Sequence, residues 1–289
     1  MKLVAAECAL RAGAVLGEGP VWHDRKLWWV DIESWRVHCY DPPQNHDESW
    51  LLDDRVSFVI PTSRGGFIIG LGGALARFEP ASGKVTPIAT PEADLPGNRF
   101  NDAKCDSSGR LLAGTMSIAE APGCGSLYRM DTSCQIERLI EGVSISNGLA
   151  WASDDRTMYY IDSPTRRVDA FDFDPLHGTL TNRLPVVEIQ DAFPDGMSID
   201  AEGNLWVALW GGWGVACFDP RTGKQLAKVE VPVEAVTSCC FGGPELTDLY
   251  ITSASRDLDA EGKRQQPLAG SVFRAHVGTA GLPTQAFAG

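Results

Sequence analysis

The sequence predicts an all-β fold, a six-bladed β-propeller, and two observations carry that prediction. A unit of about forty residues recurs along the chain, and each copy holds short apolar runs separated by Gly, Asp, Ser or Pro clusters. Helical 3.6-residue periodicity is not sustained over even one 12-residue window, which argues against helical repeats and α/β folds. Units of this length with about four short strands are typical of propeller blades, because closing a ring of blades removes most exposed sheet edges.

The six units follow one another with little between them. The clearest copies are residues 16–42, 146–175 and 194–223, and each contains Asp-Pro near its end. Weaker copies begin at Val56, Phe100 and Thr237. In every copy we interpret the apolar runs, rich in Val, Ile, Leu, Trp and Tyr, as antiparallel hairpin strands.

Two apolar segments lie toward the ends of the chain: KLVAAECAL at residues 2–10, before the first unit, and SVFRAHVG at residues 271–278, in the last unit. We expect both to belong to one shared blade, because pairing the two ends of the chain would fasten the ring. Residues 1–289 are then expected to form a single propeller domain.

The repeat sets a register in which six polar residues occupy equivalent places. Each opens the first strand of its unit, about ten residues before the next apolar run: Glu18, Ser57, Asn101, Asn147, Asp195 and Ser238. The first strand of each propeller blade lines the central channel. We therefore expect the six side chains to form a ring at one mouth of that channel.

Three members of this ring share a local form, since Glu18, Asn147 and Asp195 each precede a glycine and an apolar stretch. Two carboxylates and an amide oxygen suit a hard or borderline divalent cation such as Ca, Mg, Mn or Zn. Asn101 is the candidate for a fourth contact. Without a cation the two carboxylates would repel each other, and one would have to become protonated.

The same dipeptides have a simpler interpretation, because Asn-Gly and Asp-Gly are the commonest pairs in hairpin turns. Glu-Gly at Glu18 is a poor turn pair, however, and the three dipeptides occur in one register across three units. Both features favour the metal site.

The charge balance limits the partners of the chain. Its 25 Lys and Arg residues against 38 Asp and Glu residues give a net charge of −13, a field that repels phosphate backbones and anionic lipid. No signal peptide and no run of eighteen apolar residues is apparent, so we expect a cytoplasmic protein, with no nucleic-acid or membrane partner. We expect reduced thiols, and a monomer as the default for a closed ring.

Several segments, taken in order, resemble the regucalcin and gluconolactonase family, also called the senescence-marker-protein family. They are LGEGPVW, NRFNDAKCDSSGRLLAGTM, ISNGLAW, PDGMSIDAEGNLWVA and TSCCFGG, and they extend over nearly the whole chain. The resemblance implies a six-bladed propeller with one divalent metal ion held by Glu18, Asn147 and Asp195. These ligand types do not choose among Ca, Zn, Mn and Fe.

The resemblance also implies hydrolysis of a sugar lactone, such as glucono-, xylono- or arabinono-lactone, to the aldonic acid, with Arg99 and Asn101 contacting the sugar. In several relatives a glutamate after the segment matching GTM also contacts it. Ungapped counting places Ala119 at that position, with Glu120 next to it, and we take Glu120 as the candidate. We expect Asp195 to be the catalytic general base, with the metal acting as a Lewis acid.

Other functions use the same residues. A related propeller could hydrolyse phosphotriesters with the same metal and base, although Arg99 favours a polyhydroxylated substrate. A calcium-binding regulatory propeller without turnover is a second alternative. A pure interaction scaffold is a third, but it leaves the acidic ring unexplained.

Overall fold

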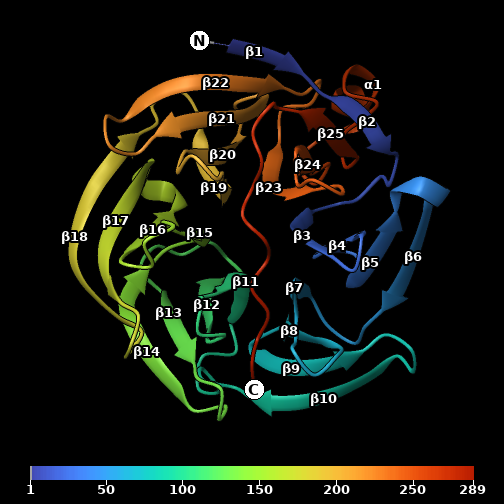
Figure 1. Ribbon diagram of the computed structural model, residues 1–289. Coiled ribbons are helices and arrows are strands. Elements are labelled where there is room, and N and C mark those ends of the chain that lie inside the picture. The colour runs from blue at the N-terminus through green and yellow to red at the C-terminus, as the bar shows by residue number, and fades with distance from the viewer. Residues whose placement is uncertain (1) are drawn as a thin grey trace.

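The computed structural model describes residues 2–289 and contains six antiparallel sheets arranged as blades around a central channel (Figure 1). The sheets follow the six sequence units in order, and the first strand of each unit is the innermost strand of its blade. Neighbouring innermost strands contact one another around the whole ring. The predicted all-β, six-bladed propeller is confirmed.

The first three blades each contain four consecutive strands. The first blade is β3 (Gly17–His23), β4 (Lys26–Asp31), β5 (Arg36–Asp41) and β6 (His46–Leu51). The second is β7 (Val56–Pro61), β8 (Phe67–Leu71), β9 (Ala74–Glu79) and β10 (Lys84–Ala89). The third is β11 (Asn98–Cys105), β12 (Leu111–Ser117), β13 (Gly125–Met130) and β14 (Ile136–Val143).

The fourth blade also contains four consecutive strands, whereas the fifth and sixth blades include strands from the N-terminal segment. The fourth blade is β15 (Ser146–Trp151), β16 (Thr157–Asp162), β17 (Arg167–Asp174) and β18 (Thr179–Glu188). The fifth is β19 (Phe193–Ile199), β20 (Leu205–Trp210), β21 (Gly214–Asp219) and β22 (Lys224–Glu230), with β1 (Lys2–Ala5) at its outer edge. The sixth is β23 (Val236–Gly242), β24 (Asp248–Ser253), β25 (Val272–His276) and β2 (Glu7–Leu10).

Helices are few and short. Two 3₁₀ turns, η1 (Pro42–Gln44) and η2 (Ser163–Thr165), and one α-helix, α1 (Ala260–Gln265), occur within residues 2–289. None of the helices in this range has the length and apolar character needed to cross a membrane.

The N-terminal segment fastens two blades rather than one. β2 pairs antiparallel with β25, where Arg274 Nε donates a hydrogen bond to Glu7 Oε1 at 2.9 Å, so residues 7–10 share a blade with residues 271–278 as predicted. The expectation was wrong for β1, which pairs in parallel with β22 of the fifth blade. Ala6 lies between β1 and β2, where the chain passes from the fifth blade to the sixth. Its backbone N–H donates to the Glu230 carbonyl at 3.1 Å.

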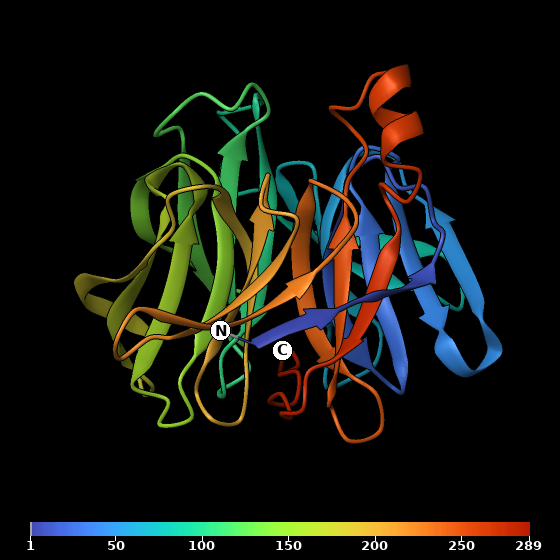
Figure 2. The ribbon, with the colours of Figure 1, turned by 90° about the horizontal axis from the view of Figure 1, so that it is seen from above.

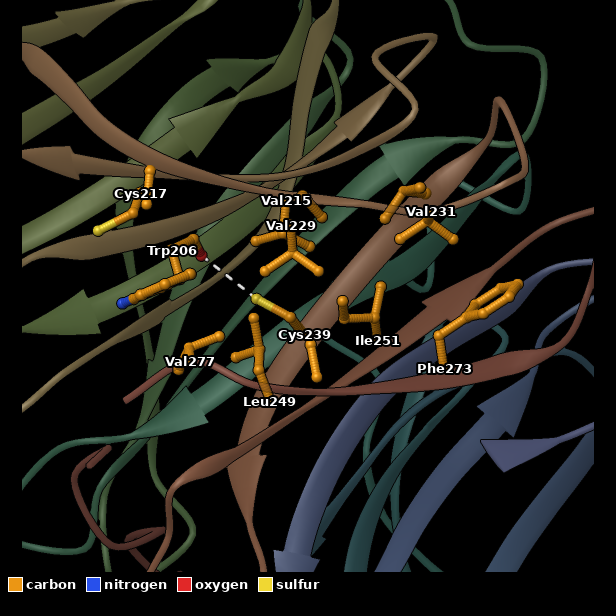
Figure 3. Packing of buried hydrophobic residues seen from close by; sticks show 14 of the residues in the cluster. Trp206, Val215, Cys217, Val229, Val231, Cys239, Leu249, Ile251, Phe273 and Val277 are labelled. Atoms are coloured by element: carbon orange, nitrogen blue, oxygen red, sulfur yellow. Dashed lines mark hydrogen bonds between the residues drawn. The ribbon is translucent and has the colours of Figure 1, made fainter. Parts of the chain in front are cut away.

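Apolar side chains fill the spaces between blades because each strand alternates its faces and both faces of a blade meet a neighbour. Figure 3 shows the contact between the fifth and sixth blades, where Trp206, Val229 and Ile251 pack around Cys239. The Cys239 Sγ donates to the Trp206 carbonyl at 3.3 Å, so this thiol behaves as a small apolar group with one weak donor.

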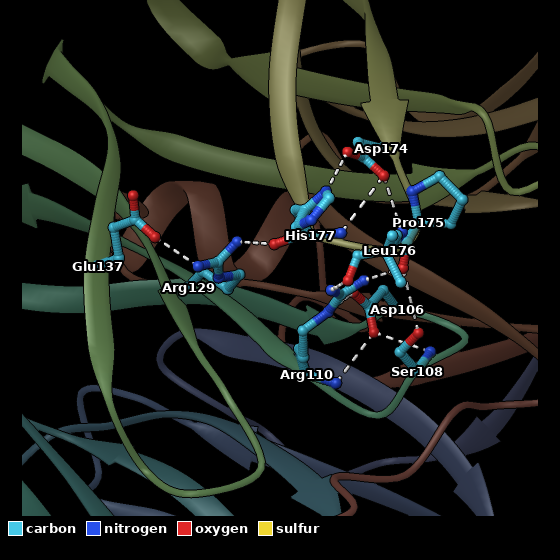
Figure 4. A network of polar contacts seen from close by, with 9 residues as sticks. All are labelled: Asp106, Ser108, Arg110, Arg129, Glu137, Asp174, Pro175, Leu176 and His177. Atoms are coloured by element: carbon cyan, nitrogen blue, oxygen red, sulfur yellow. Dashed lines mark hydrogen bonds and ion pairs between the residues drawn. The ribbon is translucent and has the colours of Figure 1, made fainter.

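Polar contacts join the third and fourth blades at their turns (Figure 4). The guanidinium of Arg110 donates to Asp106 Oδ2 at 2.6 Å within its own turn. It also donates to the carbonyls of Leu176 and Pro175, at 3.1 and 2.8 Å, in the β17–β18 turn. One buried side chain thus satisfies the backbone of two adjacent blades.

The C-terminal segment crosses one end of the channel. After β25 the chain runs over the centre of the ring (Figure 1), and the backbone N–H groups of Gly281 and Phe287 donate to the carbonyls of Leu246 and Pro61, both at 2.8 Å. Figure 2 shows this segment and α1 at opposite ends of the ring. One mouth is therefore covered by the chain terminus, and the other is surrounded by loops.

Phe287 anchors the C-terminal segment, and its truncation should destabilise the fold. The side chain is fully buried among Phe58, Phe100 and Leu111. Phe287→Ala is expected to lower the free energy of unfolding by about 3–5 kcal/mol, measured by urea denaturation. Leu282→Ala, in the same segment but 36% exposed, serves as the control and should cost clearly less. Equal losses would show that Phe287 is not the anchor.

Candidate functional site

The innermost strands all depart from regular pairing near the same mouth of the channel. Each carries a β-bulge where the sequence placed its polar ring: between Glu18 and Val21, Val56 and Val59, Phe100 and Ala103, Asn147 and Leu149, Pro194 and Met197, and Val236 and Ser238. An extra residue in a strand bends it and re-aims its side chains. The bulges therefore determine which polar groups turn toward the mouth.

The glycines after the ring residues allow neighbouring innermost strands to approach closely. A Cβ on Gly196 would lie 2.0 Å from the Ser238 Oγ, and one on Gly148 would lie 2.8 Å from the Met197 Cβ. Both glycines lie inside strands, β15 and β19, so the hairpin-turn interpretation is wrong for Asn147-Gly148 and Asp195-Gly196.

A cavity of about 350 Å³ lies at this mouth, and the structure brings every predicted site residue into its wall. These residues are Glu18, Arg99, Asn101, Glu120, Asn147 and Asp195. Ala119, the alternative to Glu120, does not line the cavity. Leu16, Met116, Ile145, Phe193 and Trp210 supply an apolar part of the wall.

The predicted ring is correct for four of its six members and wrong for the two serines. Ser57 does not line the cavity: its Oγ donates to the Phe100 carbonyl at 2.6 Å and accepts from Arg99 Nη1 at 3.5 Å. Ser238 lies beyond the bulged residue Thr237 and faces a second cavity of about 330 Å³, which the C-terminal segment also lines. Ser238 follows the bulge of its strand, whereas the four correctly predicted residues precede the bulge of theirs or lie within it, so the Ser238 side chain lies further along the channel.

Two buried carboxylates dominate the electrostatics of the site. Glu18 and Asp195 are 9% and 8% exposed, and Glu18 Oε2 accepts from the Gly19 N–H at 2.9 Å. Burial, followed by the charge of Asp102, raises the pKa of Glu18 to about 8. Burial, followed by the charge of Glu18, raises the pKa of Asp195 well above its usual range. Negative charge is therefore disfavoured at both carboxyl groups when no cation is bound.

The nearest compensating charge is Arg99, which is itself buried and has its pKa lowered to about 10 by that burial. Its Nη1 donates to Asn101 Oδ1 at 2.6 Å and to the Phe100 carbonyl at 2.8 Å. Its Nε and Nη2 make no hydrogen bond within residues 2–289, so they remain free to donate to a ligand.

The Asn147 amide is oriented by groups on either side. Its Nδ2 donates to Ser163 Oγ at 2.8 Å, and Ser163 Oγ donates to the Pro194 carbonyl at 2.6 Å. Its Oδ1 accepts from Asn101 Nδ2 at 3.1 Å. The amide oxygen therefore faces the side of the site where Asn101 lies. Ser163 was missed by the sequence analysis because a serine after a strand carries no distinctive signal.

Two further charged residues, Arg256 and Asp257, also line the cavity and were missed. Arg256 Nη2 lies 2.7 Å from Glu120 Oε1, and its guanidinium carbon lies 6.0 Å from the centre of the Trp210 ring. Arg256 belongs to the irregular segment after β24, where the sequence repeat gives no register.

The donor set fits a divalent cation. Asp195 Oδ1 is buried and has no hydrogen-bond partner in the described part of the chain, an arrangement that is costly unless a ligand supplies the missing contact. Within residues 2–289 no three His, Cys, Asp or Glu side chains gather as a metal site, so a cation here would need the Asn147 oxygen beside the two carboxylates. Two anionic oxygen donors and one amide oxygen suit Ca, Mn, Fe or Zn.

The chain is similar in sequence and in structure to known proteins. Residues 16–255 match the SMP-30/gluconolactonase/LRE-like region. The regucalcin of Xenopus laevis is 38% identical over 299 residues, covering 100% of both chains. A luciferin-regenerating enzyme has a TM-score of 0.92 at 33% identity, over 98% of this chain and 99% of that one. A regucalcin from Agrobacterium tumefaciens, described as a calcium-binding protein, has a TM-score of 0.94 at 27% identity, over 99% of each chain.

In protein stripped of divalent cations, Glu18 should make stability fall as pH rises. Its pKa increases from an ordinary 4.5 to about 8 in the fold, so the folded state binds a proton more tightly than the unfolded chain. The resulting stabilisation is present below about pH 4.5 and is lost as pH approaches 8. Glu18→Gln should therefore flatten the decline of the urea midpoint between pH 5 and pH 8.

Glu48→Gln, at an exposed position of β6, is the matched control and should retain the wild-type decline. Equal pH dependence in the two variants would contradict a raised pKa of Glu18 in the folded protein.

Proposed function

The chain belongs to the SMP-30/gluconolactonase family, and from this premise we propose that it is a divalent-metal-dependent lactonase that hydrolyses a sugar lactone to the aldonic acid. One observation carries the proposal. The unpartnered, buried Asp195 Oδ1 lies in a cavity wall that also holds Glu18, Asn147 and Arg99. That wall combines oxygen donors that suit a divalent cation with a guanidinium whose Nε and Nη2 remain free to donate to a polar substrate.

Glu18, Asn147 and Asp195 would hold the cation. When bound, it would act as a Lewis acid that draws electron density from the lactone carbonyl. Calcium is the first cation to test, because the Agrobacterium tumefaciens relative is described as calcium-binding. Zn, Mn and Fe accept the same donors and belong in the same series.

Asp195 is the proposed general base. Its carboxylate would take a proton from the water that attacks the carbonyl carbon, and would return it to the ring oxygen as the ring C–O bond breaks. The ring oxygen leaves as a hydroxyl group, and the carbonyl carbon becomes the carboxyl of the aldonic acid. Asp195 must be ionised for this. A cation held beside Glu18 and Asp195 would favour the ionised form of both carboxyl groups.

Arg99 and Asn101 are proposed to hold the sugar hydroxyl groups. Arg99 keeps Nε and Nη2 free for acceptors, while its Nη1 is fixed on Asn101 Oδ1. Asn101 in turn donates to Asn147 Oδ1, so substrate contacts and a metal ligand share one hydrogen-bond chain. A buried guanidinium whose Nε and Nη2 remain free to donate fits a polyhydroxylated lactone better than a neutral phosphotriester.

A second candidate is calcium binding without turnover, and the name of the regucalcin relatives favours it. The same donors serve both functions, so the cavity geometry does not distinguish them. A measurement of lactone turnover distinguishes them.

The test is proton release from a panel of five- and six-membered aldonolactones, with chelator-stripped protein and each cation restored in turn. We expect turnover of at least one lactone, restored by a divalent cation. Asp195→Asn should then lower kcat by roughly 10²–10⁴-fold because the general base is lost. Cation binding without turnover of any lactone would replace the lactonase proposal with the calcium-binding alternative.

Ser163→Ala should weaken cation binding by about 10- to 100-fold, because the group that orients Asn147 is removed while every proposed ligand remains. Calorimetric titration of calcium into stripped protein measures the change. Thr165→Ala, in the same 3₁₀ turn, is the control, since Thr165 Oγ1 bonds only to the Asp162 carbonyl. Unchanged affinity in Ser163→Ala would show that Asn147 needs no such support.

A further inference from the structure

An ion pair spans the mouth of the site from opposite sides of the ring. Glu120 follows β12 in the third blade, and Arg256 follows β24 in the sixth. Both strands end at the site mouth, because Ser117 pairs with Asn98 at the start of β11 and Ser253 pairs with Val236 at the start of β23. Figure 2 shows both loops at the same end of the ring. Arg256 Nη2 and Glu120 Oε1 are 2.7 Å apart.

Both residues project from anchored backbone. The N–H and Oγ of Ser255 donate to the carbonyls of Val15 and Ala14, at 3.0 and 2.9 Å. Glu120 adopts a left-handed conformation, with φ of 56°, and its N–H donates to the Ser117 carbonyl at 2.9 Å. That conformation is unfavourable for a residue with a side chain and is common at binding sites, where surrounding contacts maintain it.

The pair leaves one donor and one acceptor free. Arg256 uses Nη2 for Glu120 and Nε for Asp257, at 3.4 Å, while Nη1 has no hydrogen bond within residues 2–289. Glu120 Oε2 likewise has none in that range. The two side chains are 31% and 46% exposed, so the pair is accessible to a ligand. A fixed N–H beside a fixed carboxylate oxygen matches neighbouring hydroxyl groups, which both donate and accept.

We propose that Arg256 determines specificity for polyhydroxylated lactones, by holding Glu120 across the mouth and by donating from Nη1 to a substrate hydroxyl. This inference rests on the proposed lactonase function. Glu18 and Asp195 lie on the innermost strands, whereas Glu120 and Arg256 lie on the loops above them. The pair would therefore contact the part of the substrate remote from the reacting carbonyl, and its loss should affect binding rather than chemistry.

The experiment compares Arg256→Met with wild type on two six-membered lactones, gluconolactone and unsubstituted δ-valerolactone. Met keeps an unbranched apolar stem in place of the Arg side chain but removes its charge and donors. For gluconolactone we expect KM to rise about tenfold with kcat nearly unchanged, since a charge-assisted hydrogen bond is lost. For δ-valerolactone we expect neither constant to change.

Two further variants complete the test. Arg256→Lys keeps the charge near Glu120 and should recover part of the discrimination between the lactones. Arg264→Met is the matched control, because Arg264 lies on α1 in the same β24–β25 segment, pairs with Glu261 and does not line the cavity. It should behave as wild type.

The outcomes separate this inference from the proposed function. A wild-type protein that hydrolyses no lactone of the panel contradicts the lactonase proposal, and the inference fails with it. If the panel shows turnover of another aldonolactone but not of gluconolactone, that aldonolactone replaces gluconolactone in the comparison. An active wild type whose preference between the two lactones is unchanged in Arg256→Met overturns the specificity role alone. Equal losses of activity on both lactones, with a lower thermal midpoint, would show that the ion pair only stabilises the two loops. That result would also overturn the specificity role.

Discussion

Closure of the ring is the constraint on which the rest of this structure depends. Every blade buries apolar side chains against two neighbours, so an open ring would expose two blade faces. The N-terminal segment prevents this, because β2 completes the sixth blade beside β25 and β1 covers the outer edge of the fifth. Strands from the two ends of the chain thus hold the channel, and the site at its mouth, in place.

A closed ring makes an unfavourable site possible. Glu18 and Asp195 come from blades far apart in the sequence, yet the innermost strands bring both carboxylates to one mouth with little compensation beyond Arg99. Such a cluster lowers stability, and it persists because the packing between blades fixes the backbone that carries it. This loss of stability is consistent with a site in which a bound cation would neutralise the carboxylates.

The site divides into a rigid inner part and an outer part made by loops. The bulged innermost strands position the proposed ligands and the base, while the loops of opposing blades position Glu120 and Arg256. The proposed chemistry can remain on the strands while the loops alter the substrate, because loops tolerate substitution better than the strands they connect.

The sequence by itself determined the number of blades and four of the polar residues that face the mouth, because a repeat of fixed length carries its register with it. Glu18, Asn147 and Asp195 could be found that way. The tertiary structure alone decided the positions of Ser163 and Arg256, the displacement of Ser238, and the pairing of β1 with β22. These depend on bulges, irregular loops and contacts between distant segments, and no local pattern in the chain encodes them.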